Sequence, residues 1–198
     1  MCGGARAGFP ISDFDLIRRA GDGDSESYAE LVRSHYPKIF CLCFSLLKNQ
    51  AAADDAAQDV FLNAYRAIKT FRGTSSFSTW LHRIAANRCL DLLRRRVREK
   101  EESLEALAES REHGTRQFQD QSGNPDQCLE DADLIEKVMS HLSPDYRLIL
   151  TLRERQGLSY QELSETLECS LDAVKARLRR ARLECEEIMR HFSTVKLV

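Results

Sequence analysis

Apolar residues recur every three to four positions along most of the chain, and this spacing limits the folds that it can adopt. Within 134–142 and 60–68, for example, most of the large apolar side chains fall on one side of a helix with about 3.6 residues per turn. The alternating pattern of half-buried strands is nearly absent. We therefore predict an all-α protein, and 198 residues are enough for one or two small domains, each with its own core.

The net charge of the chain is −2, but positive and negative residues are unevenly distributed along it. Residues 12–98 hold 14 Lys and Arg against 10 Asp and Glu, residues 99–133 hold 3 against 11, and residues 134–198 hold 11 against 10. A segment as acidic and as poor in apolar residues as 99–133 cannot bury enough surface to fold alone, although a short helix fits at 103–109. We predict a disordered lead at 1–11, two helical domains at 12–98 and 134–198, and a flexible acidic linker between them.

The most informative stretch is 71–96, a polar loop between two aromatic residues followed by an amphipathic helix that ends in an arginine cluster. Gly73 and the hydroxyl residues around it break the helical pattern. Ser78 or Thr79 can cap the helix that follows. The polar face of this helix holds Arg83, Asn87 and Arg94. The apolar face holds Leu81, Ile84, Ala85 and Leu92.

Two interpretations of this stretch are open. Arginines beside aromatic rings and an amide are the mixture that holds single-stranded nucleic acid, through phosphate contacts, stacking and hydrogen bonds to base edges. Alternatively, Phe71, Phe77 and Trp80 are core residues and the arginines form a solvated face. Taken one at a time, each aromatic residue fits the core better than a binding surface.

The C-terminal part has a helix-turn-helix pattern. Ser159 and Glu162 form a capping box for a short helix, a turn follows, and the last helix begins at Leu171. Up to Arg182 this helix carries five Lys and Arg against the single acid Asp172. An exposed basic helix after such a turn fits the major groove of duplex DNA.

The two patterns together resemble the sigma-70 family of bacterial transcription initiation factors, in its extracytoplasmic-function group. Region 2 of that family has the pattern F-R-G-x-S-x-F-x-T-W-L-x-R-I-x-x-N, and every fixed position is filled between Phe71 and Asn87. Region 4 has the pattern L-x-x-x-x-R…G-L-S-Y-x-E-[IL]-[AS]…V-K-x-R-L-x-R-A-R, which is filled between Leu142 and Arg182. The resemblance implies an alternative sigma factor that binds core RNA polymerase and directs promoter-specific initiation.

The resemblance also implies the roles of three sets of residues. The helix at 52–70 would contact the clamp helices of the largest polymerase subunit through Asp55, Gln58, Asp59 and Asn63. Region 2 would capture the melted downstream (minus-10) element through Phe71, Arg72, Ser75, Ser76, Phe77, Thr79, Trp80, Arg83, Asn87, Arg94, Arg95 and Arg96. Region 4 would read the duplex upstream (minus-35) element through Asp172, Ala173, Lys175, Ala176, Arg179 and Arg180. A dedicated anti-sigma protein is a further implied partner.

Several positions depart from the family pattern. Ala52 stands where an acid usually opens the polymerase-binding helix, so Asn49 is expected to cap it. Glu168 replaces the usual turn glycine, and Asp172-Ala173 replaces Gly-Thr before the valine. Because Asp172 repels phosphate, we expect a base preference that differs from that of better-known relatives.

Cofactor and metal chemistry find little support in the sequence. The seven cysteines are scattered singly, so reduced structural thiols and no zinc site are expected, with redox sensing by Cys41, Cys43 or Cys169 as the alternative. The five histidines are dispersed, and no glycine-rich phosphate loop or nucleophile–base pair stands out. We therefore predict that the protein is not an enzyme and uses no cofactor.

A stand-alone helix-turn-helix regulator, with an effector or dimerisation domain at its N-terminal half, is the alternative function. The chain has no apolar run long enough for a membrane span and no signal-peptide core at its N-terminus. We therefore predict a cytoplasmic protein that does not insert into a membrane itself, although an anti-sigma partner could hold it at one.

Overall fold

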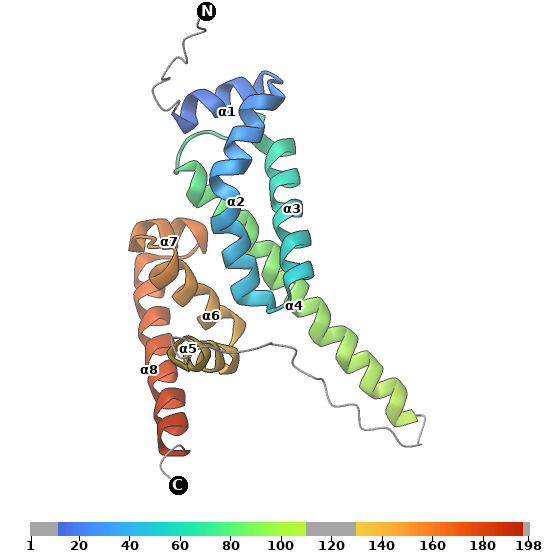
Figure 1. Cartoon of the computed structure of the whole chain (residues 1–198), viewed down its shortest axis with the longest axis vertical. Helices are drawn as coiled ribbons and strands as arrows, with labels where there is room; N and C mark the ends of the chain where they lie inside the picture. The colour runs from blue at the N-terminus through green and yellow to red at the C-terminus, as the bar shows by residue number, and fades with distance from the viewer. Residues whose placement is uncertain (1–11, 110–129, 196–198) are drawn as a thin grey trace, which may run out of the picture.

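The structure is a computed structural model that describes residues 12–109 and 130–195, and its regular elements there are all helical (Figure 1). The prediction of an all-α protein is confirmed. The predicted lead at 1–11 and most of the predicted linker, residues 110–129, lie outside the described residues. The elements are α1 (Asp13–Gly21), α2 (Ser25–Leu47), α3 (Gln50–Ala67), η1 (Ile68–Thr70), α4 (Phe77–Glu109), α5 (Glu130–His141), α6 (Pro144–Leu150), η2 (Thr151–Arg155), α7 (Tyr160–Thr166) and α8 (Leu171–Val195).

The helices α1 to α4 form an N-terminal bundle, in which α1 lies across one end of α2 and α3 (Figure 1). Asp24 caps α2, and Asn49 caps α3 by accepting a hydrogen bond from the N–H of Ala52 at 2.9 Å, which confirms the expected cap. α2 passes through Pro37 as one helix, because the turns on both sides are held by buried apolar residues. The fully buried side chains include Leu31, Ile39, Leu42, Val60, Leu81 and Ala85.

The bounds of α4 differ from those that the sequence predicts. Its cap is Ser76, whose Oγ accepts a hydrogen bond from the N–H of Thr79 at 3.0 Å, so the expected cap at Ser78 or Thr79 is wrong. The buried ring of Phe77 anchors the first turn in the core and moves the helix start toward the loop. α4 then continues to Glu109, well into the predicted linker, because that segment is rich in Glu, Lys, Leu and Ala, which favour helix.

The helices α5 to α8 form a second bundle. α5 begins at Glu130, inside the segment that the sequence predicts as linker. Ser159 and Glu162 make the expected capping box at the start of α7. Between α6 and α7 the helix widens into a π-helical turn, η2, which the sequence does not predict and which stops before Gly157 at φ +73°. The buried residues Leu163, Val174 and Leu178 form the core of the predicted helix-turn-helix.

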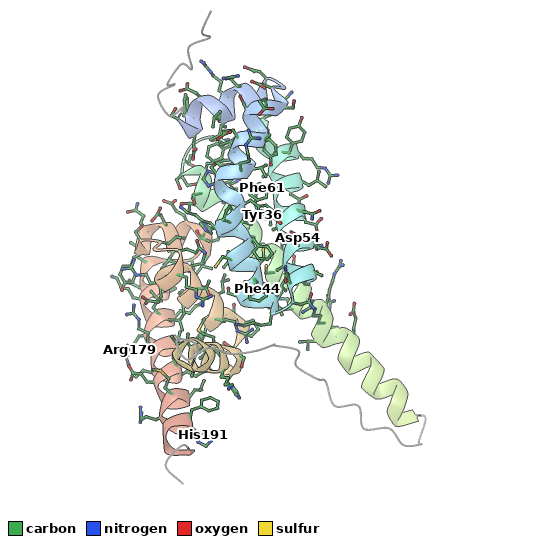
Figure 2. The ribbon with its side chains drawn as sticks, viewed as in Figure 1. Tyr36, Phe44, Asp54, Phe61, Arg179 and His191 are labelled. Carbon is green, nitrogen blue, oxygen red and sulfur yellow. The ribbon has the colours of Figure 1, made fainter. Side chains whose placement is uncertain are left out.

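The helical pattern overestimates the core at three positions. Phe44, Tyr65 and Ile135 fall on the predicted apolar stripes, yet all three are exposed. Phe44 lies at the end of a row of stacked rings with Phe40 and Tyr36 along α2 (Figure 2). The apolar stripes are wider than the surface that neighbouring helices cover, so side chains at their edges face solvent.

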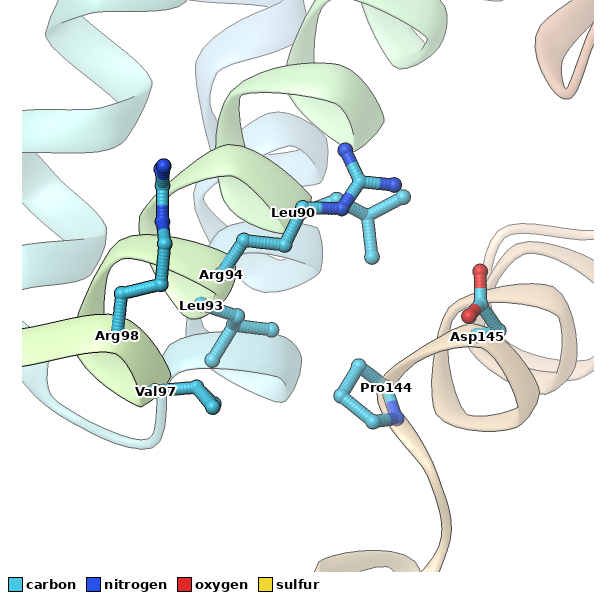
Figure 3. Close-up of a pocket in the computed structure, with 7 residues that line it drawn as sticks. All are labelled: Leu90, Leu93, Arg94, Val97, Arg98, Pro144 and Asp145. Carbon is cyan, nitrogen blue, oxygen red and sulfur yellow. The ribbon is translucent and has the colours of Figure 1, made fainter. Parts of the chain in front are cut away.

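The two bundles pack against each other through α6, η2 and α7 on one side and α2 and α4 on the other. The side-chain amide of Gln156, directly after η2, donates a hydrogen bond to the carbonyl of Lys38 in α2 at 3.3 Å. Farther along α4 the bundles separate and leave a groove of about 530 Å³ between Leu93 and Pro144 (Figure 3). The packing between the bundles is therefore tightest near the start of α4.

Candidate nucleic-acid and polymerase interfaces

Three aromatic rings pack against one another around the start of α4. The ring centroids of Phe71, Phe77 and Trp80 lie between 5.1 and 5.8 Å apart. Phe77 is only 3% exposed, whereas Phe71 and Trp80 are half-buried. Phe77 is therefore a core residue, and Phe71 and Trp80 each leave part of a ring accessible for stacking.

The loop before α4 supplies polar groups beside these rings. Arg72 is exposed and Ser75 is half-buried. Ser76 is exposed, but its hydroxyl is engaged as the cap of α4, and Thr79 is only 2% exposed. Ser75 and Thr79 lie at a hollow of about 290 Å³, which is lined by Thr74, Ser75, Thr79, Trp80, Arg83 and Glu165.

The polar face of α4 continues from the loop toward its arginine cluster. Arg94 pairs with Asp91 at 3.2 Å, and Arg96 donates a hydrogen bond to the carbonyl of Leu47 at 3.4 Å. Arg83, close to the loop, is half-buried. The structure thus brings an amide and several guanidinium groups to one side of the molecule, as the helical spacing predicts. Asn87 and Arg94 are exposed on this face, whereas Arg95 and Arg96 are exposed but lie about 100° and 200° around the helix from Arg94.

The residues expected to contact polymerase lie along α3. Asp55, Gln58 and Asn63 are exposed. Asp59 is half-buried, because its carboxylate accepts a hydrogen bond from Nε of Arg88 in α4 at 3.0 Å. Three of the four candidates are therefore exposed and can contact a partner. Asp59 also links α3 to α4 through its hydrogen bond with Arg88.

An apolar hollow beside these residues was not predicted. Leu62 and Tyr65 of α3 are 48% and 43% exposed, and with Tyr28 and Val32 of α2 they line a hollow of about 550 Å³. On the helix, Leu62 falls about 200° from Val60 and so lies off the core stripe. The sequence therefore does carry a signal for this exposed leucine, whereas Tyr65 lies on the stripe and gives none.

The upstream-element candidates occupy the exposed side of α8 (Figure 2). Asp172 pairs with Lys175 at 3.4 Å. Arg182, farther along the same helix, pairs with Glu154 of η2 at 2.7 Å, and this pairing raises the pKa of Arg182. Ala173 is half-buried, and the exposed candidates are Asp172, Lys175, Ala176, Arg179 and Arg180.

Arg147 is a buried residue to which the sequence assigns no role. Its Nε donates to the carbonyl of Met139 at 2.8 Å, and one Nη donates to those of Ser140 and Leu142 at 2.9 and 3.1 Å. Its other Nη donates to the carbonyl of Leu46 at 3.2 Å. The guanidinium thus sits at the negative C-terminal ends of α5 and α2 and joins the two bundles, while burial lowers its pKa.

His82 is buried at the same seam between the bundles. Its Nδ1 lies 3.4 Å from the hydroxyl of Ser78, and Nε2 makes no hydrogen bond within the described residues, although the Gln156 side chain is close. Burial lowers the pKa of His82 to about 4, and the positive charge of Lys38 adds to the effect. The imidazole is therefore neutral in the folded protein near neutral pH.

We expect this burial to make stability fall in mild acid. The unfolded chain binds a proton at His82 near its ordinary pKa of 6.5 and the folded chain only near 4, so folding stability is complete above pH 6.5 and is lost as the pH falls toward 4. The loss amounts to about 3 kcal/mol. Urea denaturation between pH 4 and 7 tests this: His82→Leu should flatten the profile in this range, whereas replacement of the exposed His191 by Gln should leave it steep. An equally steep profile for both variants would contradict the assignment.

The cysteines and the other ionisable groups give no sign of a metal site. Within the described residues no group of His, Cys, Asp or Glu could hold a metal ion. Cys43 and Cys89 are buried together, and contact with the Cys89 thiol and burial raise the pKa of Cys43. A buried thiol with a raised pKa is a poor nucleophile, which favours a structural role for Cys43 over redox sensing.

None of the described helices is long and apolar enough to cross a bilayer.

The sequence and the fold match a known family. Residues 31–99 match the family model of Sigma-70 region 2, and residues 132–185 match that of Sigma-70, region 4. The RNA polymerase sigma-H factor of Pseudomonas aeruginosa is 34% identical over 174 residues, which cover 86% of this chain and 90% of that protein. The chain therefore belongs to the sigma-70 family, in its extracytoplasmic-function (ECF) group.

Other relatives and solved structures agree with this assignment. The ECF RNA polymerase sigma-E factor of Escherichia coli K12 is 30% identical over 175 residues, 87% of this chain and 91% of that protein. The sigma factor RpoE in complex with the anti-sigma factor NepR from Bartonella quintana has a TM-score of 0.63 at 23% identity, covering 83% of this chain and 98% of that one. CnrH, in complex with the cytosolic domain of CnrY, has a TM-score of 0.67 at 22% identity, covering 90% of this chain and 97% of that one. The fold is thus shared with both solved structures.

Proposed function

We propose that the protein is an alternative sigma factor that binds core RNA polymerase and directs it to specific promoters. The observation that carries the proposal is that one chain joins a region 2 bundle with an exposed Asn87 and arginine face to a region 4 helix-turn-helix with an exposed basic helix. A stand-alone regulator needs only the second of these. We assign region 2 to the domain at 12–98 and region 4 to the domain at 134–198.

Polymerase binding is assigned to the face made by α2 and α3. Gln58 and Asp59 line the apolar hollow that contains Leu62 and Tyr65, and Asp55 and Asn63 are exposed on the same helix. An apolar centre with a polar rim is the arrangement that gives protein interfaces both affinity and register. In this family the partner would be the clamp helices of the largest subunit.

Promoter opening is assigned to the loop at 71–76 and the polar face of α4. Unpairing a base costs roughly a few kcal/mol, and a site that holds the flipped base offsets that cost without ATP. Asn87 is suited to a base edge, Trp80 and Phe71 to stacking, and Arg72 and Arg83 to phosphates. Phe77 and Thr79, both buried, would shape the site rather than touch DNA.

Recognition of the upstream element is assigned to α8. A basic helix presented by a helix-turn-helix lies in the major groove, where cations bind phosphates and a few side chains contact base edges. The pairing of Asp172 with Lys175 reduces the repulsion that Asp172 alone would exert on phosphate. An anti-sigma protein is a further proposed partner, since the solved sigma factor RpoE was captured with one.

Selection from a randomised duplex library tests the proposal. With core polymerase, the chain is expected to enrich sequences that contain two separate elements and are transcribed from a fixed start. A stand-alone regulator would instead enrich a palindrome, and would do so equally well without polymerase. Enrichment that does not depend on core polymerase would overturn the assignment as a sigma factor.

A further inference from the structure

Three glutamates of the helix-turn-helix follow one another at intervals of three. Glu162 and Glu165 lie in α7, and Glu168 lies in the turn after it. Residues three apart on a helix lie on the same side. α7 packs against α4, on the side of the molecule where α4 begins (Figure 1). The acidic side of region 4 therefore meets the basic side of region 2.

Each of the three carboxylates is placed at this contact. Glu168 pairs with Nη1 of Arg83 at 3.4 Å. Glu165 lines the 290 Å³ hollow between the loop and α4. The pKa of Glu162 is lowered mainly by its bonds from Ser159, and Thr79 and His82 of α4 are close enough to add to this effect.

This contact covers residues that the proposed function assigns to single-stranded DNA. Arg83 is half-buried and paired with Glu168, and the hollow beside Trp80 is partly closed by Glu165. A glutamate carboxylate carries the charge of one phosphate and accepts the same hydrogen bonds from a guanidinium. An incoming strand and α7 therefore compete for Arg83 and for the hollow.

We propose that α7 masks the downstream-element surface of region 2, with Glu165 and Glu168 occupying the positions of two phosphates of a bound strand. This inference rests on the proposed function of that surface. DNA binding then requires α7 to leave α4. An ion pair at 3.4 Å between partly exposed groups is weak in water, and the bundles already separate farther along α4 (Figure 3), so the mask is readily displaced.

The test variant is the double substitution Glu165→Gln and Glu168→Gly. Glu168 has φ +50°, a left-handed conformation that glycine adopts without strain, so its replacement should not unfold the turn. Glu162 is left intact, because it forms the capping box of α7. The matched control, Glu186→Gln with Glu187→Gln, also removes two negative charges, from exposed positions of α8.

Binding of a fluorescein-labelled single-stranded oligonucleotide is measured by anisotropy, with the free chain and with the chain bound to core polymerase. We expect the free test variant to bind at least about fivefold more tightly than both the parent and the control, and the amides at the start of α4 to exchange hydrogen faster in it. If the parent, the test variant and the control all bind the strand with equal affinity, the proposal that α7 masks this surface is wrong, and the proposed function stands. If no variant binds even with polymerase, the assignment of the surface to DNA fails, and the masking with it.

Discussion

Replacing Arg147 with Met is expected to lower the free energy of unfolding by about 3 kcal/mol or more. The substitution keeps most of the apolar side-chain volume but removes the donors to four backbone carbonyls, three near the end of α5 and one near the end of α2. Those carbonyls lie in a buried region that does not readily admit replacement water. Urea denaturation at neutral pH, followed by circular dichroism, measures the loss.

Two further variants separate this role from a general effect of charge. Arg147→Lys keeps the positive charge, but a compact ammonium with three donors cannot reach all four carbonyls, so we expect an intermediate loss. Arg179→Met removes an exposed arginine of α8 and should change stability by less than about 0.5 kcal/mol. If Arg147→Met were as stable as Arg179→Met, the role of Arg147 in joining the bundles would be excluded.

The features that the sequence predicts correctly are local. The caps at Asn49 and Ser159, the helix-turn-helix and the polar side of α4 all depend on residues that lie close together in the chain. Such patterns reflect interactions that form inside one element, so they can be recognised without knowing what packs against it.

The features that the sequence does not predict depend on distant contacts. Arg147 bonds to the carbonyl of Leu46, 101 positions earlier in the chain, and no local pattern indicates this. Tyr65 lies on the apolar stripe of α3 but is exposed, because no other helix covers that part of the stripe. The contact of Glu168 with Arg83 likewise exists only because the two bundles pack together.

Replacing Asn87 with Ala is expected to slow promoter opening about tenfold or more, because a hydrogen-bonded contact to a base edge contributes about 1 to 3 kcal/mol of discrimination. Asn87 is exposed on the polar face of α4, so its truncation should leave the fold unchanged. Gln50→Ala, which removes another exposed amide at the start of α3, is the control. The affinity of each variant for core polymerase is measured separately, so that a loss of binding is not mistaken for a loss of opening.

Opening is followed on promoters that carry a fluorescent base analogue in the downstream element, with each base substituted in turn. The expected result is that Asn87→Ala opens promoters more slowly and no longer distinguishes the base at one position, whereas Gln50→Ala behaves like the parent. Unchanged opening rates and unchanged base preference in Asn87→Ala, with normal polymerase affinity, would show that this face of α4 does not capture the unpaired strand.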